Sequence, residues 1–237
     1  MRNIAAIFKK ELKSFFNSPI AYIYTTVFLA FMGWFFFRSF FVIGQADMRL
    51  FFNIIPWVFL FLIPAITMRL WSEERKMGTL EIIMTLPVRD LEVVAGKFLA
   101  SAAFLVFTIV LTLPIALTVF LLGKPDPGPI LGAYIGAVLM GGAYLAVGLF
   151  ASSLTENQIV AFIVGVVLTF FLFIVGEDFI LVASPDFLAP VLSYMGLGTH
   201  YRSLMRGVVD TRDLVYYFSV IFFFLYVNVK ILETRKL

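Results

Sequence analysis

The densest group of side chains that could do chemistry lies between Ser72 and Glu81, where five of ten residues are charged. Directly after these charges, apolar residues recur at helical spacing. Thr79 is placed to cap a short helix with Glu81 in its first turn, where a carboxylate suits the helix dipole, and Pro87 would end that helix. The pattern predicts a charged amphipathic helix suited to docking another protein, although a solvated loop between apolar segments has the same composition.

Motifs for enzymatic chemistry are missing from the sequence. Gly96-Lys97 lacks the upstream glycine and the following Ser or Thr of a phosphate-binding loop. There is no HExxH or GxSxG motif and no cysteine, and a single histidine excludes a multi-histidine metal site within one copy. His200 is predicted to be a hydrogen-bonded interfacial residue. We therefore predict no catalytic residue, no metal ligand and no cofactor-binding residue.

Composition identifies the solvent around most of the chain as lipid. The 237 residues are 62% hydrophobic and 14% charged, with a mean hydropathy of +1.01. Soluble domains are about 45–50% apolar and about 25% charged. No basic stripe indicates nucleic-acid binding. The fold class predicted is an all-α polytopic membrane protein.

Six stretches are apolar and long enough to span a bilayer as helices, since about 20 residues are needed. They cover residues 20–43, 51–70, 98–122, 130–151, 158–176 and 213–232. Placing both termini in the cytoplasm puts 12 of the 18 Lys and Arg residues on the inner side, as the positive-inside rule requires. An even number of spans fits this orientation.

Residues 1–19 precede the first span and are predicted to form an amphipathic helix lying in the headgroup plane. The candidate interfacial residues are Phe8, Lys9, Lys10, Leu12 and Lys13. Two roles stay open at this point: a simple topology anchor, or a lever that contacts a cytoplasmic partner.

Residues 177–212 contain apolar pieces too short to span and interrupted by Pro and Gly, which predicts re-entrant or interfacial helices on the outer face. The fourth span carries five glycines that permit close helix packing, either inside the chain or at a subunit interface. Its sequence places them at Gly132, Gly136, Gly141, Gly142 and Gly148.

Ionisable residues such as Arg38, Arg69 and Glu177 fall near span ends, where long side chains reach the interface. Proton- or ion-coupled carriers usually need such groups at mid-membrane depth. The sequence therefore disfavours a secondary transporter and favours a bulky or amphiphilic cargo over small ions.

The run Glu74-Arg75-Lys76-Met77-Gly78-Thr79-Leu80-Glu81, followed by Leu86-Pro87-Val88 and Gly96-Lys97, resembles the signature between spans two and three of ABC-2 type transporter permeases. The segment from His200 to Asp210, continuing into Arg212-Asp213, is similar to the gliding-motility branch of that family. The resemblance covers essentially the whole chain, 1–237, as one transmembrane domain.

The resemblance implies a cytoplasmic coupling loop over residues 71–96, with a coupling helix from Glu73 to Leu86 that transmits nucleotide-driven motion. The matching positions are Glu73, Glu74, Arg75, Gly78, Thr79, Glu81 and Pro87. The amphipathic N-terminal helix would lie beside this helix, which favours the lever role.

The resemblance also implies partners. A separate cytoplasmic ABC ATPase would bind ATP and Mg²⁺, and a second permease copy or a related membrane subunit would complete a dimer. An accessory membrane protein resembling a substrate-binding protein is a further expected partner, and the setting implied is the cytoplasmic membrane of a bacterium or archaeon. We expect an exporter, with a membrane scaffold of a motility or maturation complex as the alternative from another class; the cargo stays open.

Overall fold

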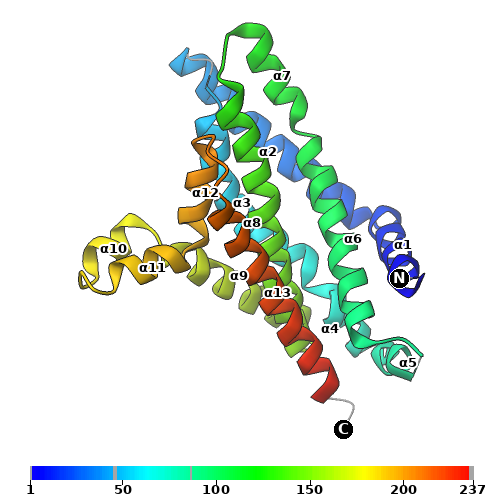
Figure 1. Ribbon diagram of the computed structural model, residues 1–237. Helices are drawn as coiled ribbons and strands as arrows, with labels where there is room; N and C mark the ends of the chain where they lie inside the picture. Colours follow the sequence, from blue (N-terminus) through cyan, green and yellow to red (C-terminus); the bar gives the residue numbers. More distant parts are fainter. Residues whose placement is uncertain (1, 45–46, 86, 235–237) are drawn as a thin grey trace.

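The computed structural model describes residues 2–44, 47–85 and 87–234, and these form an all-helical bundle (Figure 1). The prediction of an all-α protein is confirmed for the described residues, which contain no strand. The helices are α1 (Arg2–Asn17), α2 (Pro19–Ile43), α3 (Arg49–Thr67), α4 (Arg69–Lys76), α5 (Thr79–Thr85), α6 (Asp90–Val110), α7 (Leu113–Leu122), α8 (Pro127–Leu154), α9 (Gln158–Ile174), α10 (Asp178–Ala183), α11 (Ala189–Met195), α12 (Leu197–Met205) and α13 (Thr211–Thr234).

Five helical segments in the described part of the chain are long and apolar enough to cross a membrane. They are Pro19–Val42, Arg49–Lys76, Asp90–Leu122, Pro127–Leu154 and Thr211–Thr234. Each contains or overlaps one of the predicted spans. The remaining predicted span corresponds to α9, an apolar helix of 17 residues. At about 1.5 Å per residue α9 is about 26 Å long, slightly shorter than a bilayer core of about 30 Å.

Two of these segments are bent, which the span predictions did not anticipate. The second segment divides into α3 and α4 at Met68, whose N–H still bonds to the Pro64 carbonyl. The third divides into α6 and α7 just before Pro114, because a proline inside a helix removes one hydrogen bond and crowds the preceding turn.

Helix α8 forms the centre of the bundle and packs against α3, α6, α9, α12 and α13. Its glycines make this packing possible. A side chain at Gly132 would collide with the Leu204 carbonyl of α12, and one at Gly148 would collide with Thr67 of α3. The structure therefore uses the glycines of the fourth predicted span for packing inside the chain.

Helices α9 and α12 pack along α8 in succession, each beside a different part of it. Helix α9 runs antiparallel to α8, and Gly198 at the start of α12 lies against Phe173 near the end of α9. Further along α12, Tyr201 contacts Gly136 and Gly207 lies against Gly128 and Pro129 at the start of α8. Together α9 and α12 therefore cover most of the length of α8.

Helices α10 and α11 lie between α9 and α12 in the chain and project sideways from the bundle (Figure 1). Neither contains a buried residue, and Val182 and Phe187 are 87% and 75% exposed. Short helices were predicted in this region, and the exposed surfaces of α10 and α11 fit that prediction. Helix α12 differs from a surface helix, because the glycines of α8 let it pack inside the bundle with Leu197, Tyr201 and Leu204 buried.

Candidate functional site

Helix α1 packs along most of α6, and the contacts advance in the same direction on both helices. The Asn3 amide donates to Glu92 at 3.0 Å, and the Phe16 ring lies 5.3 Å from the Phe107 ring. Between these contacts, a Cβ atom on Gly96 would approach Ile7 to 2.6 Å. Glycine at this position thus lets the α1 backbone approach α6, in addition to any contact that α1 makes with the membrane surface.

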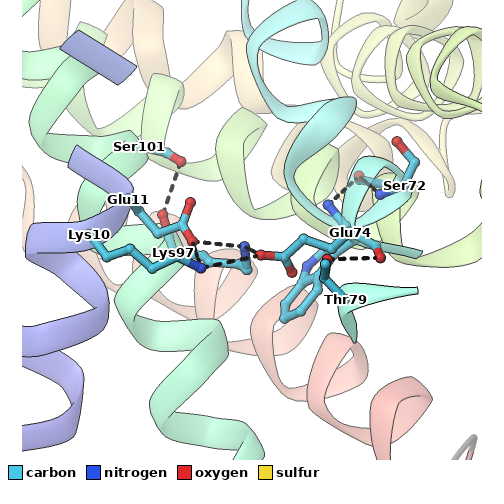
Figure 2. Close-up of polar contacts among 9 residues, drawn as sticks. Lys10, Glu11, Ser72, Glu74, Thr79, Lys97 and Ser101 are labelled. Carbon is cyan, nitrogen blue, oxygen red and sulfur yellow. Dashed lines mark hydrogen bonds and ion pairs between the residues drawn. The ribbon is translucent and has the colours of Figure 1, made fainter. Parts of the chain in front are cut away.

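This close approach forms an ion cluster around Lys97 of α6 (Figure 2). The Lys97 ammonium lies 3.1 Å from a Glu11 oxygen of α1 and 2.8 Å from a Glu74 oxygen of α4. The Lys97 side chain is only 2% exposed. One buried cation therefore connects three helices that are far apart in the sequence.

Because Lys97 is buried, the loss of either of its carboxylate partners should strongly destabilise the fold. The ammonium lies 5.0 Å from the ring centre of Trp71, a fully buried residue of α4. Lys10, whose side chain is 66% exposed, adds a second cation 3.6 Å from Glu11 and 3.9 Å from Glu74. Removing one partner of a buried ion pair costs about 3–5 kcal/mol, because the remaining charge stays buried without compensation.

Helix α4 is also attached to the end of α8. The Ser152 hydroxyl accepts hydrogen bonds from the backbone N–H groups of Trp71 and Ser72, at 3.1 and 3.2 Å, and donates to the Met68 carbonyl at 2.8 Å. The Arg75 guanidinium donates to the Ser153 carbonyl at 2.6 Å. Displacement of α4 would therefore change contacts with α1, α6 and α8 together.

The turn from α4 to α5 contains the remaining predicted positions. Gly78 has a φ of +69°, a left-handed conformation that favours glycine. Thr79 is the first residue of α5 and its hydroxyl donates to the Glu74 carbonyl at 3.1 Å, whereas Glu81 is exposed in the first turn. Helix α5 ends at Thr85, two residues before Pro87, as predicted. The predicted coupling helix from Glu73 to Leu86 is divided by the turn at Gly78 into the end of α4 and α5, and Leu86 lies outside the described residues.

A cavity of about 680 Å³ opens between α1 and α4, and the residues of the ion cluster form part of its wall. Its wall includes Lys10, Glu11, Arg69, Glu73, Glu74 and Lys97. Three of these side chains are basic and three are acidic, so the surface matches a partner that presents both signs of charge. Of the predicted N-terminal residues, Lys10 reaches this cavity, while Lys9 and Lys13 are exposed elsewhere on α1.

Sequence analysis named Lys97 only as part of the family signature and did not name Glu11, so neither was predicted as a site residue, although each carries a signal. Glu11 is the one acidic residue of α1 and lies on its apolar face, one turn from Ile7 and Phe15. Lys97 interrupts an otherwise apolar run in α6. Two opposite charges on apolar faces indicate a buried pair. Because a long segment separates Glu11 from Lys97 in the sequence, their pairing was not predicted.

The second polar cluster lies at the junction of α12 and α13. His200 is buried; its Nδ1 lies 2.6 Å from an Asp213 oxygen and its Nε2 lies 2.9 Å from the Tyr194 carbonyl. Its ring stacks on Tyr216 with 3.9 Å between ring centres. The prediction that His200 is hydrogen-bonded is confirmed, but it is buried in the bundle rather than exposed at an interface.

The two clusters join different helices, one through Lys97 and the other through His200. Among the described residues, no group of three or more Asp, Glu or His side chains is placed to hold a metal ion.

A comparison with protein-family models matches residues 5–232 to the ABC-2 family transporter proteins. A sequence comparison with curated proteins gives no match. The matched region covers nearly the whole chain, including α1, the Lys97 cluster and α13. With its apolar spanning helices and its helical bundle, the chain belongs to the ABC-2 transporter family.

Proposed function

We propose that this membrane permease works as an exporter subunit in which α4, α5 and α1 receive the motion of a separate cytoplasmic ATPase. The family membership supports a permease of an ABC transporter. The observation that carries the finer proposal is that α4 contacts α6 through Glu74 and Lys97, α1 through Glu74 and Lys10, and α8 through hydrogen bonds to Ser152 and Ser153. A partner that moves α4 by docking in the cavity would displace three helices of the bundle.

In this proposal α1 is a lever in addition to an anchor. Glu11 attaches it to Lys97, and Lys97 attaches it to Glu74. A ligand or partner can bias a conformational equilibrium only through contacts that differ between the two states. The Lys97 cluster supplies such contacts, because one ammonium can divide its hydrogen bonds differently between two carboxylates.

The proposed topology has six crossings with both termini in the cytoplasm. Five are the long apolar segments, and the remaining crossing is formed by α9 and α12. The 17 residues of α9 alone are at the lower limit for a spanning helix. Because α12 continues along α8 where α9 stops, the pair supplies the missing length.

The first experiment is purification of the tagged protein from its native membrane in mild detergent, with identification of partners and an ATPase assay. We expect a soluble ABC ATPase to co-purify. Two copies of the permease, or one copy with a related membrane subunit, would complete the proposed dimer. Membrane complexes recovered intact but without any ATPase would contradict the proposal and favour a scaffold.

The second experiment tests the coupling route with no knowledge of the cargo. The chain has no cysteine, so Glu81→Cys and Lys124→Cys can carry spin labels at exposed sites on α5 and in the α7–α8 connection. We expect the distance between positions 81 and 124 to change when nucleotide is trapped on the ATPase. Glu74→Gln should reduce this change, while Lys76→Gln, an exposed neighbour on the same helix, should not. Equal responses in the two variants would contradict the route through Glu74.

A further inference from the structure

Helix α2 has the smallest buried share of the five long apolar segments in the described part of the chain. In its most apolar stretch 22% of the residues are buried, against 61% in the segment that contains α3 and α4 and 72% in α8. Inside the chain α2 packs mainly against α3 and α1. Neither the Lys97 cluster nor the bonds to Ser152 and Ser153 include a residue of α2. Any motion of α4 must therefore reach α2 through other contacts.

Helices α2 and α3 contact each other as an antiparallel pair. The rings of Phe28 and Phe59 lie 5.9 Å apart, and the Tyr24 hydroxyl donates to the Ala65 carbonyl at 3.2 Å. Both contacts lie before the bend at Met68, where α3 ends and α4 begins. These contacts attach α2 to α3 and would not by themselves follow a movement of α4 about that bend.

Arg69, the first residue of α4, lies directly after the bend and contacts the corner between α1 and α2. Its Nη1 donates to the Ser18 hydroxyl at 3.3 Å, and its guanidinium carbon lies 5.7 Å from the ring centre of Phe15. Phe15 is 3% exposed and stacks on Phe104 of α6, with 5.2 Å between ring centres. One side chain of α4 therefore contacts both the last turn of α1 and the residue that precedes α2.

Ser18 determines where α2 begins. It is the N-cap residue of α2, and its hydroxyl oxygen accepts from the Ile20 N–H at 3.4 Å. Its backbone N–H donates to the Phe15 carbonyl in the last turn of α1 at 3.1 Å. A hydroxyl oxygen has two lone pairs, so Ser18 can accept from Arg69 and cap α2 together. A movement of the Arg69 guanidinium would therefore act on the first turn of α2.

The shape of the guanidinium suits this pair of contacts. An arginine side chain is planar, stacks on aromatic faces and presents its N–H donors in fixed directions, whereas a lysine carries one compact charge. Among the described residues no carboxylate forms an ion pair with Arg69, so Ser18 and Phe15 are the contacts that orient it.

We propose that Arg69 is a positioning residue that transmits displacement of α4 to α2. The inference rests on the proposed function, in which an ATPase moves α4, and it adds α2 to the helices that respond. Helix α4 can turn about the bend at Met68 while α3 stays in place, and the contact of Arg69 with Ser18 then moves the start of α2 together with α4. Helix α2 has little buried surface inside the chain to oppose this movement.

The test compares two distances in the complex with the ATPase. Spin labels at Val42→Cys on α2 and Val208→Cys in the α12–α13 connection report on α2, and both side chains are exposed, at 82% and 61%. The 81–124 distance reports on the proposed function itself. We expect both distances to change when nucleotide is trapped. A change at 81–124 without one at 42–208 would overturn the inference and leave the proposed function standing, whereas a constant 81–124 distance would overturn the proposed function.

The role of Arg69 is tested by the ratio of the two distance changes. Arg69→Lys keeps the charge on the cavity wall but removes the planar group, so the 42–208 change should be lost to a greater extent than the 81–124 change. Lys10→Gln is the matched control, because Lys10 lies on the same cavity wall and forms its ion pairs with Glu11 and Glu74. Any loss of docking in the control lowers both changes together and leaves their ratio unchanged.

Ser18→Gly tests the same contact from the other side. It removes the acceptor of Arg69, and glycine is tolerated at an N-cap, so α2 should still begin at this position. The variant should lower the ratio, and it repeats the test should Arg69→Lys fail to fold. Combining the two substitutions should lower the ratio no further, because both remove one contact. A ratio equal to that of the unmodified protein in both single variants would overturn the proposal.

Discussion

The Lys97 cluster and the His200 cluster are both buried and charged, but they are built differently. Lys97 divides its contacts between Glu11 and Glu74, which belong to different helices, and a cavity of about 680 Å³ opens beside it. His200 has one carboxylate partner, Asp213, and aromatic rings enclose it. The Lys97 ammonium can therefore shift between two carboxylates, whereas His200 contacts a single carboxylate.

Hydrogen bonding explains why the His200 cluster is fixed. Both ring nitrogens have a partner, Asp213 at Nδ1 and the Tyr194 carbonyl at Nε2. Aromatic rings pack around the imidazole, so the ring has little freedom to rearrange.

The Lys97 cluster contains one more buried carboxylate than buried cation. The second oxygen of Glu74 is buried without a hydrogen-bond partner among the described atoms, as is the second oxygen of Asp213, so the two clusters differ in their number of buried carboxylates and not in this respect. Lys10 approaches from the exposed side and offsets part of the charge. This difference suggests that the α4 end of the bundle is the adjustable part, while the α12–α13 junction holds the helices in a fixed relation.

The largest expected effect is from Lys97→Met. The substitution leaves Glu11 and Glu74 buried without their common cation and should lower the free energy of unfolding by about 3–5 kcal/mol. Thermal unfolding of the purified protein in detergent measures the loss. The 81–124 distance should also stop responding to nucleotide. A normal response in a folded Lys97→Met protein would place the coupling route elsewhere.

A triple variant separates stability from coupling. Lys97→Met combined with Glu11→Gln and Glu74→Gln removes all the charges, so most of the lost stability should return, because neutral replacements of buried ion pairs are often tolerated. The response of the 81–124 distance should stay absent. Recovery of both properties would show that the charges are only structural.

The next effect concerns the attachment of α4 to α8. Ser152→Ala leaves the N–H groups of Trp71 and Ser72 without their acceptor, which should cost about 1–3 kcal/mol of unfolding free energy. Ser153→Ala is the matched control, since its hydroxyl donates only to the Phe150 carbonyl of its own helix. Thermal unfolding of the two variants side by side provides the measurement, and equal losses would contradict the special role of Ser152.

Asp213→Asn probes the fixed cluster. The asparagine amide can still hydrogen-bond to Nδ1, so the geometry is kept while the charge of the carboxylate is lost, at a cost of about 1–2 kcal/mol. If the His200 cluster is fixed during coupling, the distance between positions 81 and 124 should still change with nucleotide in this variant. Loss of the response in Asp213→Asn protein that remains folded would show that both clusters move.

Composition and periodicity were sufficient to predict an all-helical membrane protein, because a helix that spans lipid must be long and apolar. They also located the short helix that starts at Thr79 and predicted short helices between residues 177 and 212. Periodicity could not show that α9 and α12 pack along α8 in succession. Their positions depend on glycine contacts between distant segments, Gly136 with Tyr201 and Gly198 with Phe173.

In the candidate site, too, the sequence predicted the residue of a local motif but not the contacts between distant segments. Glu74 belongs to a local motif and was predicted from it, but Glu11 and Lys97 are separated by 86 positions in the chain. Their pairing depends on the close approach of α1 and α6 at Gly96, which no local pattern encodes. Isolated charges on apolar faces are the useful signal for such pairs.

The smallest effect that we predict is that of Tyr217→Phe at the α12–α13 junction. The Tyr217 hydroxyl donates to the Leu197 carbonyl at 2.8 Å, and the residue is fully buried, so its removal deletes one buried hydrogen bond and should cost about 1 kcal/mol. Tyr226→Phe is the control, because Tyr226 is 62% exposed on the same helix. Thermal unfolding distinguishes the two variants. A larger loss from Tyr217→Phe than from Asp213→Asn would mean that the tyrosine contacts, and not the His200 ion pair, fix α12 against α13.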